Sequence, residues 1–159
     1  MILDPARRGR ALAELVLTLG PRLFEEIVES GLLPAAPPAA PAPARAEWDC
    51  FALYACVRGL VAAGGFNRET AAAIEALHER VLEHATAASK ATASERYAEY
   101  GAIGQEGGKA GAASVALRLG EAAARHMVSG EPPAALAELV GSLHESLAEG
   151  AAEAVRRAV

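Results

Sequence analysis

The stretch EWDCFALYACVRGLVAA, residues 47–63, decides the fold. Its centre, residues 50–57, carries no charge, so a helix built from it is apolar around nearly its whole circumference. A helix of that kind belongs at the centre of a core. We therefore predict a central helix here, stopped by Gly64-Gly65. This helix holds three of the seven aromatic residues of the chain, namely Trp48, Phe51 and Tyr54.

The composition around this stretch points the same way. The chain has 159 residues, of which 40 are alanine, and only 4% are aromatic. Alanine favours helix because it loses no side-chain entropy there, although each buried alanine adds little apolar area to a core. The few aromatic residues argue against a sandwich or a barrel. An excess of arginine over lysine, 13 against 2, indicates a GC-rich genome, and we expect a bacterial protein.

Upstream, residues 1–33 form an N-terminal helical segment in which Pro5 suits the first turn and Gly20-Pro21 marks a break or a kink. Residues 34–46 read PAAPPAAPAPARA, which predicts an extended, proline-rich linker rather than helix. A spacer is the simpler interpretation. The alternative is a docking ligand that uses the P-x-x-P pair Pro38 and Pro41.

Downstream, residues 47–159 are expected to form the core of the bundle. Asn67 caps a third helix, and a fourth is expected to begin near Ser94. Residues 112–128 predict a largely enclosed helix that pairs with the helix from Glu47 at the centre. Residues 134–159 form an amphipathic face that Gly150 divides. We expect an all-α fold, a single-domain helical bundle of five to seven helices.

A glycine cluster in residues 101–111 allows two interpretations. A loop is one, because glycine favours turns. The other is a continuous helix with a stripe of small residues, along which a second backbone can approach closely. Lys109 suits an anion site at a helix start, although residues 103–110 do not match a phosphate-binding loop. The stripe consists of Gly104, Gly108, Ala112, Ala116, Gly120 and Ala124.

Glu75 and His78 have the Glu-x-x-His spacing found in carboxylate-bridged di-metal bundles. Such a site needs a second motif of this kind, and the other three histidines lack the preceding glutamate. Glu75 also falls about 90° from the centre of the buried stripe of this helix, whereas His78 lies near that centre. The favoured interpretation makes His78 a core or boundary residue, and we expect no metal site.

Two tyrosines stand close together beside the glycine cluster, in the sequence RYAEY of residues 96–100. Tyrosine and arginine are enriched where proteins meet their partners. The alternative is that both tyrosines fill the core. The expected interface comprises Arg96, Tyr97, Tyr100, Gly104, Gly108 and Ala112.

Charge and cysteine content exclude several classes of protein. A net charge of −5 with scattered basic residues argues against nucleic-acid binding. Cys50 and Cys56 are too divergent on a helix for a disulfide, so buried free thiols and a cytoplasmic location are expected. The longest apolar stretch contains Arg58, which argues against a membrane span.

Three classes of function are compatible with these patterns. The favoured class is a non-catalytic interaction or assembly subunit, most simply a homo-oligomer. The second is a helical ligand-binding or sensor domain, since small side chains leave room for a pocket. The third is a metal-dependent bundle enzyme that uses Glu75 and His78. No motif for a catalytic nucleophile is present, and no cofactor is predicted.

Overall fold

A computed structural model describes residues 4–33, 41–110, 112–128 and 131–157. Within these ranges the chain forms six helices and no strand. The predicted all-α class is therefore confirmed, as is the number of helices. The helices are α1 (Pro5–Glu29), α2 (Pro41–Gly64), α3 (Arg68–Glu83), α4 (Ala87–Ala110), α5 (Ala112–Met127) and α6 (Ala134–Arg157).

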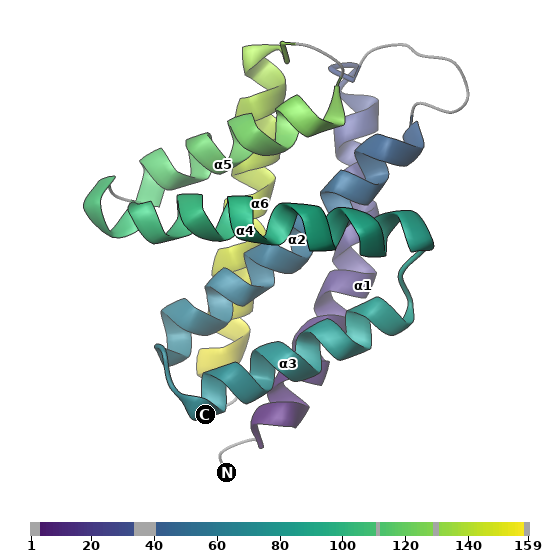
Figure 1. Cartoon of the computed structure of the whole chain (residues 1–159). Coiled ribbons are helices and arrows are strands. Elements are labelled where there is room, and N and C mark those ends of the chain that lie inside the picture. The colour runs from purple at the N-terminus through teal and green to yellow at the C-terminus, as the bar shows by residue number, and fades with distance from the viewer. Residues whose placement is uncertain (1–3, 34–40, 111, 129–130, 158–159) are drawn as a thin grey trace.

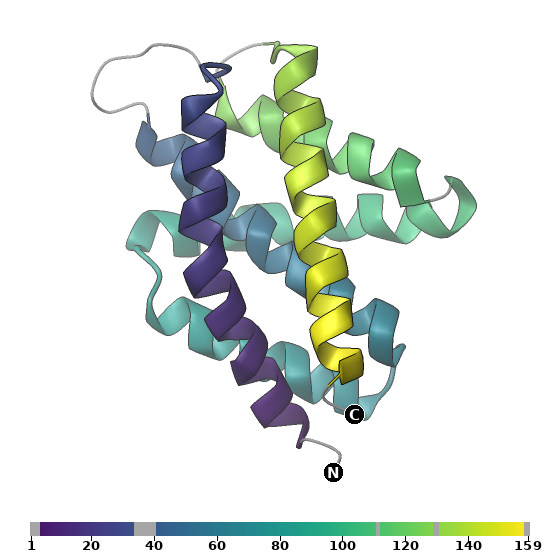
Figure 2. The same ribbon diagram turned by 180° about the vertical axis from the view of Figure 1, so that it is seen from behind.

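The helices form one bundle with α2 in the middle. Figure 1 shows α3, α4 and α5 on the side nearer the viewer, with α2 passing behind them. Figure 2 shows α1 and α6 side by side on the opposite face, with their chain directions opposed. Helix α2 packs against all five other helices of the described chain. The predicted central position of α2 is confirmed.

The core around α2 is built from its aromatic residues. Trp48 and Phe51 are fully buried, and the indole N–H of Trp48 donates to the Gly20 carbonyl at 2.9 Å. Phe51 stacks on the ring of His144 from α6, with centroids 4.0 Å apart. Tyr100 from α4 packs on Phe51 as well. The two aromatic clusters of the sequence therefore meet in one core.

The start of α2 corrects the predicted linker. Helix α2 begins at Pro41, so residues 41–46 are helical rather than extended. Proline is compatible with the first turn of a helix, where its missing N–H has no intrahelical partner. Pro41 therefore belongs to α2 rather than to a P-x-x-P ligand. Residues 34–40, including Pro38, lie outside the described ranges.

Three other expected boundaries also change. Helix α1 continues through Pro21, and α6 continues through Gly150. Helix α4 begins at Ala87, several residues before Ser94. Neither α1 nor α6 is interrupted, because burial along a whole helix face outweighs the local preference of one glycine or proline.

Helix α5 is less enclosed than the sequence predicts. Leu117, Glu121 and Arg125 are exposed along one of its faces. The position beside α2 is taken by α6, which packs along both α2 and α5. Alanines rather than bulky residues allow this packing, since Ala151 of α6 is fully buried.

The glycine cluster is helical up to Ala110, so the loop interpretation is wrong for residues 101–110. The chain then reverses, and α5 returns beside α4 (Figure 1). The predicted stripe is therefore divided between two helices and forms no single face. Gly111 lies outside the described residues, as do the side chains at 108, 109 and 112, where the stripe and the Lys109 anion site were expected.

Close backbone approach does occur, but within the bundle. A Cβ atom on Gly120 would collide with the Ala137 carbonyl and lie 2.8 Å from Gly141 Cα, where α5 crosses α6. Gly59 meets Ala148 and its neighbours in the same way where α2 crosses α6. These glycines and alanines let helix pairs pack at short distance.

Candidate functional site

A cleft of about 640 Å³ opens between α3 and α4. The two helices diverge from their short connection after Glu83, and α2 passes behind the gap (Figure 1). This volume falls within the range of small-molecule sites, about 300–1,000 Å³. The lining is more apolar than polar, and it consists of Leu53, Ala71, Ile74, Glu75, His78, Leu82, Lys90, Ala93, Ser94 and Tyr97.

Helix α3 forms one wall of the cleft. Contacts at its first turn and along the face that packs on α1 hold the helix in position. The Asn67 side chain accepts a hydrogen bond from the Thr70 N–H at 2.8 Å and caps the helix. Its other side packs on α1, where Gly9 leaves room for the Ala73 carbonyl and the Ala76 methyl. With Ala73 and Leu77 turned into the core, Ile74 and His78 are left to face the cleft.

Helix α4 forms the other wall, and its first turn is tied to α2. The Thr86 hydroxyl accepts from the Ser89 N–H at 3.1 Å, which caps the helix. The Ser89 hydroxyl donates to the Asp49 carboxylate of α2 at 2.9 Å. Lys90 follows directly, so its place at the cleft depends on this connection.

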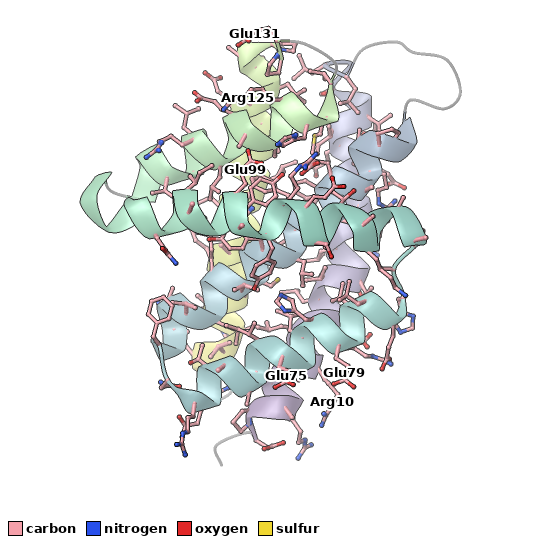
Figure 3. The ribbon with its side chains drawn as sticks, in the orientation of Figure 1. Arg10, Glu75, Glu79, Glu99, Arg125 and Glu131 are labelled. Carbon is pink, nitrogen blue, oxygen red and sulfur yellow. The ribbon has the colours of Figure 1, made fainter. Side chains whose placement is uncertain are left out.

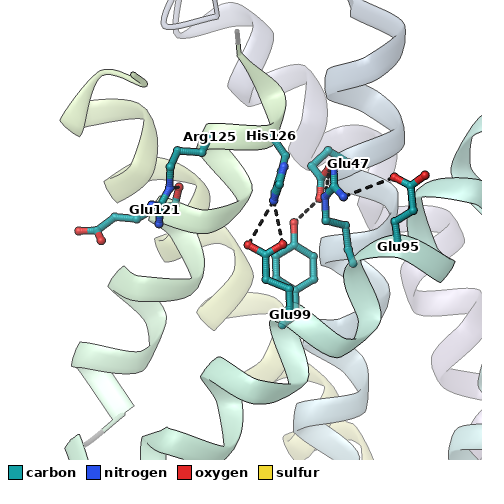
Figure 4. Close-up of polar contacts among 8 residues, drawn as sticks. Glu47, Glu95, Glu99, Glu121, Arg125 and His126 are labelled. Carbon is teal, nitrogen blue, oxygen red and sulfur yellow. Dashed lines mark hydrogen bonds and ion pairs between the residues drawn. The ribbon is translucent and has the colours of Figure 1, made fainter. Parts of the chain in front are cut away.

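A buried polar cluster fixes the middle of α4 (Figure 4). Glu47 of α2 is only 2% exposed and accepts hydrogen bonds from Tyr100 and, at 3.1 Å, from Arg96. Burial raises the pKa of Glu47, while the Tyr100 hydroxyl and the Arg96 charge act in the opposite direction. Burial and the Glu47 charge also raise the pKa of Tyr100. The cluster locks α4 to α2 beside the cleft.

A second polar pair joins α4 to α5. His126 contacts the Glu99 carboxylate, with Nε2 2.8 Å from Oε2 (Figure 4). The α4 residue of this pair, Glu99, lies within the same turn as Arg96 and Tyr100 of the Glu47 cluster. Together the pair and the cluster hold the helix on two sides, which leaves the face with Tyr97 free to line the cleft.

His78 and Tyr97 are the residues that bring the two walls together. Their rings meet edge to face, with centroids 5.1 Å apart. The Nε2 atom of His78 is buried and has no hydrogen-bond partner among the described residues. Burial lowers the pKa of His78, so the imidazole is neutral at pH 7. Tyr97 remains 40% exposed and also contacts the ring of Tyr54.

The Glu75 and His78 pair of the metal hypothesis is found on this cleft, but without further ligands. Glu75 is exposed on α3 (Figure 3). No group of three or more His, Cys, Asp or Glu side chains within the described part of the chain is arranged to hold a metal ion. A di-metal site of the bundle type needs more carboxylates than these positions bring together.

The expected interface residues separate into different environments. Tyr100 is fully buried, and Arg96 is partly buried in its pair with Glu47, so both serve the core. Tyr97 is the tyrosine that reaches the surface. Gly104 makes room for the Tyr54 hydroxyl, which a Cβ atom would displace. Gly108 and Ala112 lie in helical backbone whose side chains are not described.

The sequence singled out Glu75, His78 and Tyr97 but not Lys90 and Ser94, the other polar residues of the cleft. Lys90, Ser94 and Tyr97 are spaced i, i+4 and i+7, which places them on one face of α4. This spacing could have revealed the face if the helix had been started at Ala87 rather than near Ser94. Leu53 was recognised as apolar, but an apolar circumference does not tell which side faces a cleft.

The two thiols and the charged grooves offer no stronger site. Cys50 and Cys56 are free and buried as predicted, and burial raises the pKa of each to about 12. A groove of about 490 Å³ between α1 and α3 carries Arg80, which is paired with Glu14 and Glu83. Its walls carry both signs of charge, and they are less apolar than those of the α3–α4 cleft.

Comparisons with known proteins identify no relative. No family model matches the chain, and neither the curated proteins nor the solved structures include a match. Across the described ranges, none of the helices combines the length and apolar character that a membrane crossing requires. The α3–α4 cleft is therefore the feature from which a function can be inferred.

Proposed function

We propose that this protein is a helical ligand-binding or sensor domain that holds a small, largely apolar molecule in the α3–α4 cleft. The observation that carries the proposal is the cleft itself, with its ligand-sized volume and its floor of Leu53 from the central helix. Leu53, Ile74 and Leu82 supply apolar surface, and His78 supplies a buried polar atom without a partner. Mostly apolar walls with a few polar groups are typical of small-molecule sites.

The test is the binding of Nile red, a neutral apolar dye whose fluorescence rises when it leaves water. Ala93→Phe introduces a ring into the cleft, whereas Ala98→Phe adds the same ring to an exposed position of α4 outside the lining. We expect saturable binding by the wild type and by Ala98→Phe, and at least about tenfold weaker binding by Ala93→Phe.

Circular dichroism and urea unfolding followed by Trp48 fluorescence serve as controls for folding. If Nile red does not bind, or if it binds equally to folded Ala93→Phe and Ala98→Phe, the proposal is contradicted. Binding that follows the loss of native structure in either variant would be recognised in the same controls.

The interaction or assembly subunit, favoured by the sequence, is the second candidate. The observation that supports it is a set of exposed large apolar side chains, which lie on four different segments of the chain. Light scattering of the full chain tests self-association, since a strict monomer at every concentration contradicts the homo-oligomer. The exposed large apolar side chains that support this second candidate are Val28, Phe66, Tyr97 and Leu117.

We also retain the cytoplasmic location and the bacterial origin as proposals. The two free, buried thiols support a reducing compartment. The excess of arginine and alanine supports a GC-rich bacterial genome.

A further inference from the structure

Four of the five polar side chains that line the cleft can donate a hydrogen bond. Lys90, Ser94 and Tyr97 present an ammonium group and two hydroxyl groups from one face of α4. His78 contributes an imidazole from α3. The carboxylate among the lining residues is Glu75, which is exposed. A ligand acceptor group can therefore meet up to four donors here, and the Lys90 ammonium is a donor only.

Two of these donors have no partner within the described chain. Lys90 is exposed and forms no ion pair with a described carboxylate. The Nε2 atom of His78 is buried and makes no hydrogen bond. By contrast, the cations Arg80 and Arg96 already form ion pairs with neighbouring glutamates. The lining of this cleft therefore includes both an unpaired cation and a buried nitrogen without a partner among the described residues.

We infer that the ligand is an apolar molecule that carries one carboxylate group, an inference that rests on the ligand-binding function proposed above. Its apolar part packs on Leu53, Ile74 and Leu82. Its carboxylate pairs with the Lys90 ammonium and accepts hydrogen bonds from the His78 and Ser94 side chains. Charge-assisted hydrogen bonds of this kind are shorter and stronger than neutral ones.

Glu75 sharpens the expected specificity. Its carboxylate lies on the same cleft, so it repels an acid and attracts an amine. An amine bound at Glu75 is the competing arrangement. Glu75 and Lys90 are both exposed, so water screens both charges, and the additional donors of His78 and Ser94 favour the acid.

The experiment compares three probes of the same shape by isothermal titration calorimetry: 2-naphthoate, 2-naphthamide and 2-naphthylmethylammonium. We expect 2-naphthoate to bind about tenfold more tightly than the amide, the effect of one charge-assisted hydrogen bond. The amine should bind most weakly. Lys90→Met should abolish the preference for the acid, and Lys90→Arg should retain it.

Glu75→Gln tests the carboxylate inference independently, because it removes a charge that repels the acid. It should tighten the binding of 2-naphthoate and leave the amide unchanged, because only the acid carries a charge that Glu75 repels. Equal affinity for acid and amide, or tighter binding of the amine, overturns the carboxylate inference even if Nile red still binds. If neither Nile red nor any naphthalene probe binds, the ligand-binding function itself has failed.

Discussion

Glu47 is an acidic side chain at a position that water scarcely reaches. Compared with the unfolded chain, the folded protein favours its neutral form, because burial raises its pKa above the ordinary value of 4.5. In the unfolded chain the carboxyl group ionises at its ordinary pKa. The free energy of unfolding should therefore fall as pH rises from about 4.5 through the raised pKa, and then level off.

The pH dependence that Glu47 gives to the free energy of unfolding can be isolated with Glu47→Gln. Glutamine keeps an acceptor for the Tyr100 hydroxyl but does not titrate, so the variant lacks the loss of stability at higher pH. We expect the variant to gain stability relative to the wild type between pH 4.5 and 7.5 in urea unfolding. Glu131→Gln, at an exposed position, is the matched control. A stability difference between Glu47→Gln and wild type that stays constant with pH contradicts this account.

The sequence showed some of these residues and concealed others. Tyr97 and Tyr100 were recognised as unusual, but nothing in their spacing tells which one is buried. The partner of Tyr100 is Glu47, 53 residues away, and such long-range pairs follow from tertiary packing. His144 likewise stacks on Phe51, and its Nδ1 atom lies 3.1 Å from the Phe51 carbonyl oxygen. In the sequence it was only one of the three histidines that lack the preceding glutamate.

At the scale of the elements, small residues determine how closely helices cross. Gly120 of α5 and Gly141 of α6 meet at a crossing with no space for a methyl group. Gly150, farther along α6, has no neighbouring atom within 4 Å of an added Cβ. Helix α6 therefore contains one glycine that packing requires, Gly141, and one that packing does not require, Gly150.

Alanine substitutions should separate these two roles. Gly120→Ala should destabilise the protein by about 1–3 kcal/mol, since a backbone carbonyl must move to admit the methyl group. Gly150→Ala should stabilise it by about 0.5–1 kcal/mol, because alanine favours an exposed helix. Thermal and urea unfolding measure both. Equal effects of the two substitutions would show that the crossing does not depend on Gly120.

The helices themselves were largely predictable, but their boundaries and partners were not. Apolar periodicity predicts α3 and α6 because each has one face to bury, whereas the uncharged centre of residues 50–57 predicts α2. It does not predict that α2 begins at Pro41, because the first turn needs no N–H from that residue. The small-residue stripe failed for a different reason. The chain reverses near Gly111, and four-residue spacing carries no information about a reversal.

At the scale of the whole molecule, the central claim is that α3 and α4 diverge over α2 to form a ligand site. The polar cluster at Glu47 and the Ser89–Asp49 contact hold α4 in place, and the packing of α3 on α1 holds the opposite wall. The cleft is therefore a product of several separate contacts. This explains why no short motif of the sequence revealed it.

The most direct test of this claim is methyl NMR of the full chain, titrated with Nile red and then with 2-naphthoate. We predict that shifts are concentrated at the methyl groups of Leu53, Ile74 and Leu82, which line the cleft. The methyl signals of Leu12 and Leu136, which are buried elsewhere in the core, should not shift. Shifts centred on Leu117, or no saturable shift at Leu53, Ile74 and Leu82, would contradict the account.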